Sequence, residues 1–170
     1  MISIMQFDEK YTKDVIDLVL HFQNDGTRPL VTVDDQPDLL NIEDSYIKVG
    51  GNFWIAVDDG KLAGSIGIMP CGNKIAVMKK FFVYEKYQGE PFHLGQKLYS
   101  YLLEFAKEKS YEIIMLDTPR NTVRAHKFYE MAGFKKVREK DLPIKFSHPY
   151  NEDVSDFFII NLKDKELQYD

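Results

Sequence analysis

Residues 82–98 read FVYEKYQGEPFHLGQKL, a stretch that carries the end of an apolar strand through a polar, glycine-bearing turn into a helix. The helix begins near Leu94, where apolar residues start to recur at helical spacing. The first N–H groups of a helix have no intrahelical acceptor, and the helix dipole is positive there. Backbone N–H groups can therefore hold a diphosphate at this point, and Gly95 leaves room for its approach. The pattern predicts an anion-binding turn, but it also fits an ordinary strand-to-helix connection.

Strands are predicted on both sides of this stretch. Residues 53–57, 62–69 and 75–83 are apolar runs separated by turn residues, which indicates an antiparallel meander. The helical repeat that starts at Leu94 then continues to Phe105. Residues 111–116 form a nearly continuous apolar run, which is typical of a strand buried on both faces. A right-handed crossover would set that strand parallel to the third strand of the meander.

The two ends of the chain add further elements. Residues 2–7 alternate like a half-buried strand, and Asp8 can cap the helix that follows. Pro37 suits the first turn of a second helix that runs toward Gly50. A last strand is predicted at residues 157–162. The predicted fold class is α+β, a mixed and mostly antiparallel sheet with a parallel central strand pair and helices on both faces.

A second landmark is the sequence RAHKFYEMAGF, residues 124–134, which follows the predicted parallel strand. In this order, the two segments resemble the GNAT superfamily of acetyl-CoA-dependent N-acetyltransferases. In that family a strand ending in Val, then Tyr, then Arg or Gln and Gly, opens the pyrophosphate loop, and an Ala, Phe-Tyr-Glu, Gly-Phe pattern follows the next strand. The matching positions, within a resemblance over roughly residues 53–134, are Val83, Tyr87, Gln88, Gly89, Ala125, Phe128, Tyr129, Glu130, Gly133 and Phe134.

Two features depart from the family pattern. The loop after Gln88 is about two residues longer than the family loop and lacks the middle glycine. Asn121 lies four residues before Ala125, whereas the family places an Asn three residues before it. The departures concern individual phosphate and cofactor contacts and leave the helix terminus intact.

The resemblance implies transfer of an acetyl group from acetyl-CoA to a primary amine of a small molecule or peptide, by direct attack in a ternary complex. A main-chain N–H near the end of the third meander strand would donate to the thioester oxygen. The Tyr129 hydroxyl would act as the general acid on the leaving thiolate, although a tyrosine buried only for packing is the alternative. The implied cofactor-binding residues are Phe82, Val83, Gln88, Gly89, Leu94, Gly95, Gln96, Asn121 and Phe128.

The base that takes the proton of the amine is the less defined part of the site. Asp117, at the end of the parallel strand, and Glu43, on the predicted second helix beside Asp44, are the candidates. A water chain is an equal alternative, and each carboxylate also fits a solvated surface charge. The acceptor is expected to be chosen by the loops at residues 26–38 and 142–153, and the acidic residues of the first loop hint at a cationic amine.

Residues 1–170 are expected to form one N-acetyltransferase domain, with an acceptor side at 1–50, a cofactor-binding core at 53–134 and C-terminal strands at 135–162. The net charge of −5 argues against a nucleic-acid partner. The single cysteine and the lack of a long apolar run favour a cytoplasmic protein without membrane contact. No histidine pair has metal-ligand spacing, so no metal is expected, and a homodimer is compatible with the sequence.

Two other functions stay open. A catalytically silent acyl-CoA-binding or regulatory domain of the same fold would account for the altered loop and for the lack of an obvious base. A nucleotide-phosphate binder would use the same helix terminus, but the Gly-Lys-Ser/Thr ending of a P-loop is absent.

Overall fold

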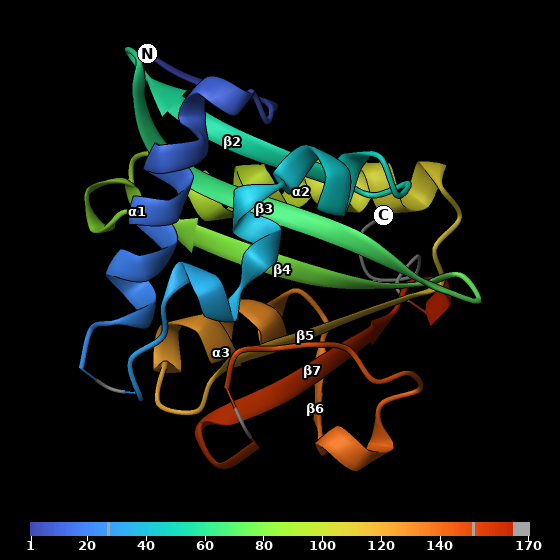
Figure 1. Cartoon of the computed structure of the whole chain (residues 1–170). Coiled ribbons are helices and arrows are strands. Elements are labelled where there is room, and N and C mark those ends of the chain that lie inside the picture. Colours follow the sequence, from blue (N-terminus) through green and yellow to red (C-terminus); the bar gives the residue numbers. More distant parts are fainter. Residues whose placement is uncertain (27, 151, 165–170) are drawn as a thin grey trace.

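A sheet of seven strands runs through the computed structural model, which describes residues 1–26, 28–150 and 152–164 (Figure 1). The strand order is β1-β2-β3-β4-β5-β7-β6, and every neighbouring pair is antiparallel except β4 and β5, which run parallel. The predicted fold class is therefore confirmed. The strands are β1 Ile2–Gln6, β2 Asn52–Asp58, β3 Lys61–Gly72, β4 Ile75–Val83, β5 Ile113–Pro119, β6 Lys135–Val137 and β7 Ser155–Asn161.

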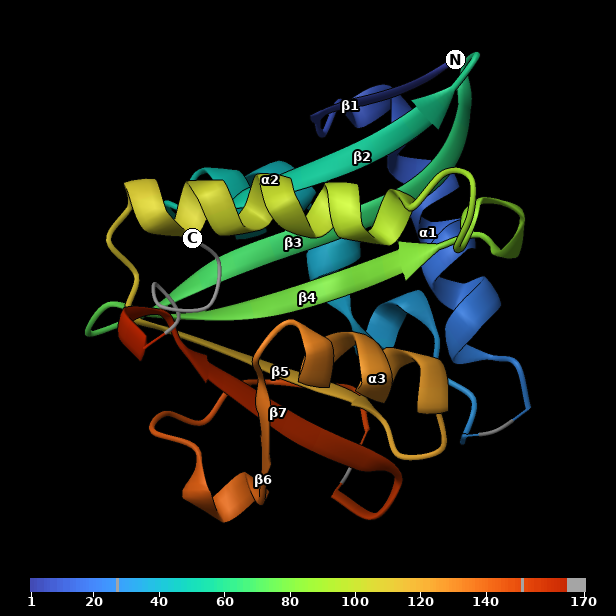
Figure 2. The same ribbon diagram turned by 180° about the vertical axis from the view of Figure 1, so that it is seen from behind.

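Helices cover both faces of the sheet. Helix α1, Thr12–Gln23, lies on the face seen in Figure 1, called here the front face. Helices α2, Leu94–Glu108, and α3, Val123–Met131, lie on the back face (Figure 2). Alternate residues of β2 point to the two cores, since Phe53 packs with α1 on the front while Trp54 packs with α2 on the back.

The prediction of a second helix after Pro37 is wrong. Residues 33–47 form three short turns instead, Val33–Asp35, Pro37–Leu40 and the π-helical turn Glu43–Ile47. The backbone leaves the helical region at Asn41, where φ is −141° and ψ is 57°. The break turns Leu39 and Tyr46 into the front core, where both are fully buried, so tertiary packing overrides helix propensity.

Other boundaries shift without changing the topology. β3 extends beyond the predicted end at residue 69 and continues through Cys71 to Gly72. β5 begins at Ile113 and extends to Pro119, and β7 begins at Ser155. Asp8 caps a single 3₁₀ turn ahead of α1 by accepting a hydrogen bond from the Lys10 N–H. The charged sequence from Lys163 onward predicts a solvated tail, and residues 165–170 of it lie outside the described residues.

Gly51, at the junction between the π-helical turn and β2, provides a test of this packing. A Cβ there would lie 2.0 Å from the Ile68 carbonyl oxygen and 2.8 Å from that of Tyr46, and backbone atoms cannot move aside as a flexible side chain can. We therefore expect Gly51→Ala to lower the free energy of unfolding by about 2 kcal/mol or more. Urea unfolding followed by circular dichroism measures the change.

Gly95→Ala is the matched control. A Cβ at Gly95 would make only an ordinary contact, 3.6 Å from the Phe81 ring. Since alanine is the better helix former, this variant should unfold at the same or slightly higher urea concentration than the wild type. Equal stability of the two alanine variants would contradict the packing described for Gly51.

Candidate active site

The parallel strands β4 and β5 pair over only three residues and then separate. Residues 75–77 of β4 lie opposite residues 113–115 of β5. Beyond them, β4 stays with β3 while β5 stays with β7 as far as Pro119. The divergence is visible in Figure 2. Among the described residues, the free edge of β4 from Met78 to Val83 has no strand partner.

A cavity of about 80 Å³ lies in this gap. Tyr129 of α3 borders it from the back face, and Tyr150, whose hydroxyl donates to the Gln23 carbonyl of α1, borders it from the front. The gap therefore connects the two faces of the sheet. The lining residues are Gln23, Arg28, Met78, Lys79, Lys80, Phe81, Phe82, Leu116, Asp117, Thr118, Pro119, Tyr129, Pro149 and Tyr150.

A β-bulge in β4 shapes the wall of the gap. The register with β3 changes from Ser65 opposite Phe82 to Gly67 opposite Lys79, so β4 carries an extra residue. Lys80 lies in the bulge with φ of 56°, an uncommon conformation for a residue with a side chain. The Ser65 hydroxyl donates to the Lys80 carbonyl at 2.7 Å and holds this conformation.

The bulge buries the Lys80 side chain on the front face, where 6% of it is exposed. Its ammonium donates to Gln36 Oε1 at 2.5 Å and lies 3.9 Å from Asp38. Gln36 in turn exchanges two hydrogen bonds with Gln23 of α1. Burial lowers the pKa of Lys80 to about 8, against the opposing effect of Asp38. This network ties α1 and the 33–47 segment to β4 beside the gap.

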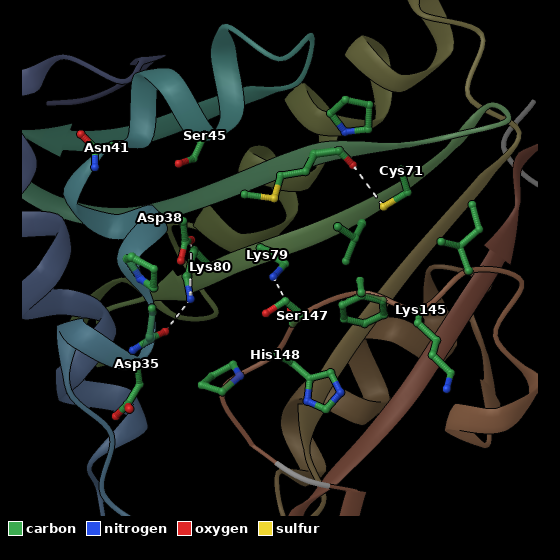
Figure 3. Close-up of a pocket in the computed structure, with 18 residues that line it drawn as sticks. Asp35, Asp38, Asn41, Ser45, Cys71, Lys79, Lys80, Lys145, Ser147 and His148 are labelled. Carbon is green, nitrogen blue, oxygen red and sulfur yellow. Dashed lines mark hydrogen bonds and ion pairs between the residues drawn. The ribbon is translucent and has the colours of Figure 1, made fainter.

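A larger cavity of about 550 Å³ adjoins the gap on the front face and shares Lys79, Lys80 and Pro149 with it (Figure 3). The 35–45 segment, β3, β4 and residues 144–149 form its walls. Its two acidic side chains are already engaged. Asp35 accepts from the Thr32 N–H at 2.8 Å, and Asp38 accepts from the Tyr46 hydroxyl at 2.6 Å. Asp38 is thus used within the fold, whereas Asp35 is exposed and keeps its negative charge.

On the back face, α2 begins next to the gap. His93 precedes it in the left-handed conformation, with φ of 47°, and its side chain caps no N–H group of the helix. Gly95 lies in the first turn, where an added Cβ would come 3.6 Å from Phe81 and 3.9 Å from Phe128. The helix start is therefore within contact distance of both the bulged strand and α3.

Two side chains border the loop that leads into α2. The Gln88 side chain folds back and donates to the Val83 carbonyl at 2.8 Å, so it satisfies the last carbonyl group of β4. Gly89 has φ of 66°, and a Cβ built on it would lie 3.3 Å from Arg124 Nη2 of α3. Arg124 thus places a permanent positive charge beside the loop.

Tyr129 and Asp117 line the same gap cavity. Tyr129 is 6% exposed and packs its ring against Phe134 and Phe158. Burial, with a further contribution from the charge of Asp117, raises the pKa of Tyr129 well above its usual value. The hydroxyl therefore stays protonated and is a hydrogen-bond donor at any physiological pH.

The remaining predicted site residues are distributed as follows. Phe82 lines the gap, while the Leu94 side chain is buried in the back core and leaves only its main chain for a ligand. Glu43 is exposed on the π-helical turn and borders neither cavity. Asn121 lies in the turn before α3 and does not cap it, because Thr122 holds the N-cap position, without a side-chain hydrogen bond.

Sequence reasoning missed several charged residues of the site. Arg28, Lys79 and Lys80 line the gap, yet none belongs to a recognisable motif. Arg124 borders the loop and is the first residue of the 124–134 landmark, but it is not one of the positions that match the family pattern. The only signal for Lys80 was the pair of adjacent lysines, Lys79 and Lys80, inside an otherwise apolar strand, because one of two neighbouring strand residues points inward and a buried charge needs a partner. No group of three metal-ligating side chains is found in the described part of the chain. Nor do the described residues include a helix that is long and apolar enough to cross a membrane.

Comparison with known sequences identifies a matching family and relatives of this chain. The profile of the acetyltransferase (GNAT) family matches residues 17–134. A probable N-acetyltransferase, camello, of Xenopus tropicalis is 30% identical over 74% of this chain and 58% of its own length. The N-acetylaspartate synthetase of the same organism is 36% identical over 59% of this chain and 37% of its own length. The chain thus spans only part of these relatives.

The comparison of structures extends over nearly the whole chain. An acetyltransferase from Streptococcus agalactiae superposes with a TM-score of 0.87 at 33% identity. The match covers 94% of this chain and 98% of that protein.

The depressed pKa of Lys80 predicts a pH dependence of stability. The folded-state pKa of about 8 lies below the ordinary value of 10.5, so between these pH values the unfolded chain binds more protons than the folded one. The free energy of unfolding contributed by this group therefore rises with pH over that window. Relative to Lys80→Met, we expect wild type to gain roughly 1–3 kcal/mol between pH 7 and pH 10.

Urea unfolding of both proteins at the two pH values gives this double difference. Tyrosines and the other lysines titrate in both proteins and cancel. A difference between wild type and Lys80→Met that does not change with pH would contradict the burial of a charged amine at the bulge.

Proposed function

This chain belongs to the GNAT family of acetyltransferases, and on that premise we propose that it transfers an acetyl group from acetyl-CoA to a primary amine. The observation that carries the proposal is the gap between β4 and β5, which connects a helix N-terminus on the back face with a larger cavity on the front. Acetyl-CoA would enter from the back, and the amine from the front. Both substrates would meet in one ternary complex, where alignment supplies much of the acceleration.

In this proposal the coenzyme phosphates bind at the start of α2. The first N–H groups of this helix, those of Leu94, Gly95 and Gln96, lack intrahelical acceptors and lie at the positive end of the helix dipole. Gly89 and Arg124 would complete this site on the loop side, with Arg124 adding a charge to the backbone donors.

The remaining cofactor contacts lie nearer the gap. Gln88 would act by holding the end of β4 in place through its bond to Val83. Phe128 would flank the coenzyme arm, and Asn121 is retained as a contact to that arm. These assignments follow from the family resemblance and from the proximity of Phe128 to Gly95.

The reaction would proceed by direct attack. The amine nitrogen forms a bond to the thioester carbon and gives its proton to the base, the C–S bond breaks, and the coenzyme leaves as a thiolate that takes up a proton from water. The oxygen becomes negative as the amine adds, and a main-chain N–H near Phe82 or Val83, on the unpaired edge of β4, is suited to stabilise it.

Tyr129 is assigned to the leaving sulfur and Asp117 to the proton of the amine. A tyrosine with a raised pKa keeps its proton and stabilises the thiolate by hydrogen bonding. Asp117 shares the cavity with Tyr129, so of the two candidate carboxylates it is retained as the base, acting directly or through water. Glu43 is not retained, because it is exposed and borders neither cavity.

A catalytically silent acyl-CoA-binding domain is the competing function. The long loop and the inward fold of Gln88 favour it, since neither belongs to the family pattern of phosphate contacts. Mixing the protein with acetyl-CoA and a panel of primary amines and following free thiol separates the two functions. An enzyme releases coenzyme A with at least one amine, whereas a silent domain binds the coenzyme in calorimetry and releases no thiol with any of them.

Replacement of Tyr129 by Phe tests the assigned donor. If the hydroxyl acts on the thiolate only as the C–S bond breaks, kcat should fall about a hundredfold while the KM for acetyl-CoA changes little. Tyr99→Phe is the matched control, because Tyr99 is 5% exposed, packs against the same Phe128 and Phe134 rings, and does not border the gap. An unchanged kcat in Tyr129→Phe would leave Tyr129 with a packing role only.

A further inference from the structure

Arg28 brings an unsatisfied donor to the gap. Its guanidinium carbon lies 3.9 Å from the centre of the Tyr150 ring, which covers one face of the group. Its Nε is buried, and no acceptor in the described part of the chain reaches it. A buried N–H without an acceptor loses its hydration without replacement, and such groups are rare in folded proteins. The guanidinium therefore has hydrogen-bonding capacity that the described chain does not use, although Nε itself is closed to a ligand in this conformation.

Lys79 adds a second positive charge that the protein does not neutralise at close range. Its ammonium donates to the Ser147 carbonyl and lies 5.8 Å from the centre of the Phe146 ring (Figure 3). Both partners are uncharged. Because Lys79 borders the gap as well as the larger front cavity, a ligand bound in either cavity would be close to this cation.

The carboxylates near these two cations lie partly in the front cavity and partly in the gap. Asp38 accepts from Tyr46 and lies beside Lys80, so its charge is largely matched within the fold. Asp35 accepts a hydrogen bond from the Thr32 N–H but is exposed and keeps its negative charge. Asp117 borders the gap itself, opposite in charge to Arg28 and Lys79. Among the described residues, neither Arg28 nor Lys79 has an ion-pair partner within 4 Å, although the charges of Asp117 and Asp25 act on Arg28. The gap thus brings two cations together with one carboxylate, Asp117.

We propose that the acceptor is an amine that also carries a carboxylate, and that Arg28 and Lys79 form the binding site for this carboxylate. The inference rests on the proposed acetyltransferase function and defines the chemical class of its acceptor. A guanidinium presents parallel N–H groups that match the two oxygens of a carboxylate. With the carboxylate held there, the amino group of the acceptor lies toward Asp117 and the thioester.

The gap volume of about 80 Å³ fits this division of the ligand. It holds an amino group and a carboxylate, about the space of a few water molecules, whereas the rest of the acceptor extends into the larger front cavity. The proposal replaces the expectation of a cationic amine with one of an amino acid or similar zwitterion.

Acceptor pairs that differ only in the carboxylate test the inference. The full chain is assayed for coenzyme A release from acetyl-CoA with L-aspartate and L-glutamate, and with the diamide of each. We expect kcat/KM to be at least tenfold higher for the two acids than for their diamides. The amide reduces the basicity of the neighbouring amine, so at neutral pH more of the diamide is in the reactive free-base form, and a preference for the acid cannot come from amine basicity. Equal or faster reaction of the diamides would overturn the inference and leave the acetyltransferase function intact.

Variants assign the preference to the two cations. In Arg28→Gln and Lys79→Gln, kcat/KM for the acids should fall tenfold or more, while the values for the diamides change less than about twofold. Arg138→Gln is the control, because Arg138 is an exposed residue paired with Asp141 and borders neither cavity, and it should behave like wild type. Equal losses for acids and diamides in Arg28→Gln would show a structural role and overturn the inference.

A binding measurement decides the question even if no amine is turned over. N-acetyl-L-glutamate and its diamide are titrated into the protein in the presence of coenzyme A by calorimetry. Tighter binding of the acid in wild type, with loss of that preference in Arg28→Gln, supports the carboxylate site. Equal affinity for both compounds overturns it. The absence of thiol release with every amine, combined with coenzyme binding, would refute the proposed enzyme and not the carboxylate site.

Discussion

The brief pairing of β4 with β5 is the constraint on which the site depends. Beyond residues 77 and 115 the two strands separate, and each continues with its other neighbour alone, β4 with β3 and β5 with β7. The sheet is thereby left with an unpaired main-chain edge in its centre. An unpaired edge at this position is normally a liability, since buried N–H and C=O groups require partners. A substrate that carries its own hydrogen-bond donors and acceptors, such as amide groups, can provide these partners.

The bulge at Lys80 makes this gap polar as well as open. The extra residue turns β4 locally and buries an ammonium group, which in turn requires Gln36 and Asp38 as partners. Residues 33–47 form short turns in which Gln36 and Asp38 both reach the Lys80 ammonium. In one continuous helix these two side chains, two residues apart, would point to opposite sides of the axis. The same residues build the wall of the front cavity, so the bulge, the turns and the acceptor side form one connected unit.

Local patterns in the sequence predicted the back face well. The strand, loop and helix around residues 82–98 and the Phe-Tyr-Glu segment of α3 are short-range features, and Phe82 and Tyr129 from these two segments line the gap. The front face was predicted poorly, because Arg28, Lys80 and Tyr150 meet only through long-range packing. Asp35 and Asp38 appeared to be free acids in the sequence, although both are bonded within the fold. A charge can be read from a sequence, but whether it is neutralised depends on contacts that the sequence does not specify.

The central claim is that the thioester end of acetyl-CoA reaches the gap between β4 and β5. A crystal structure of the protein with coenzyme A tests it most directly. The account predicts the diphosphate at the N–H groups of Leu94 to Gln96, the pantetheine arm along the free edge of β4, and the sulfur beside the Tyr129 hydroxyl. A coenzyme bound elsewhere, with the space between Met78 and Leu116 occupied only by water, would contradict it.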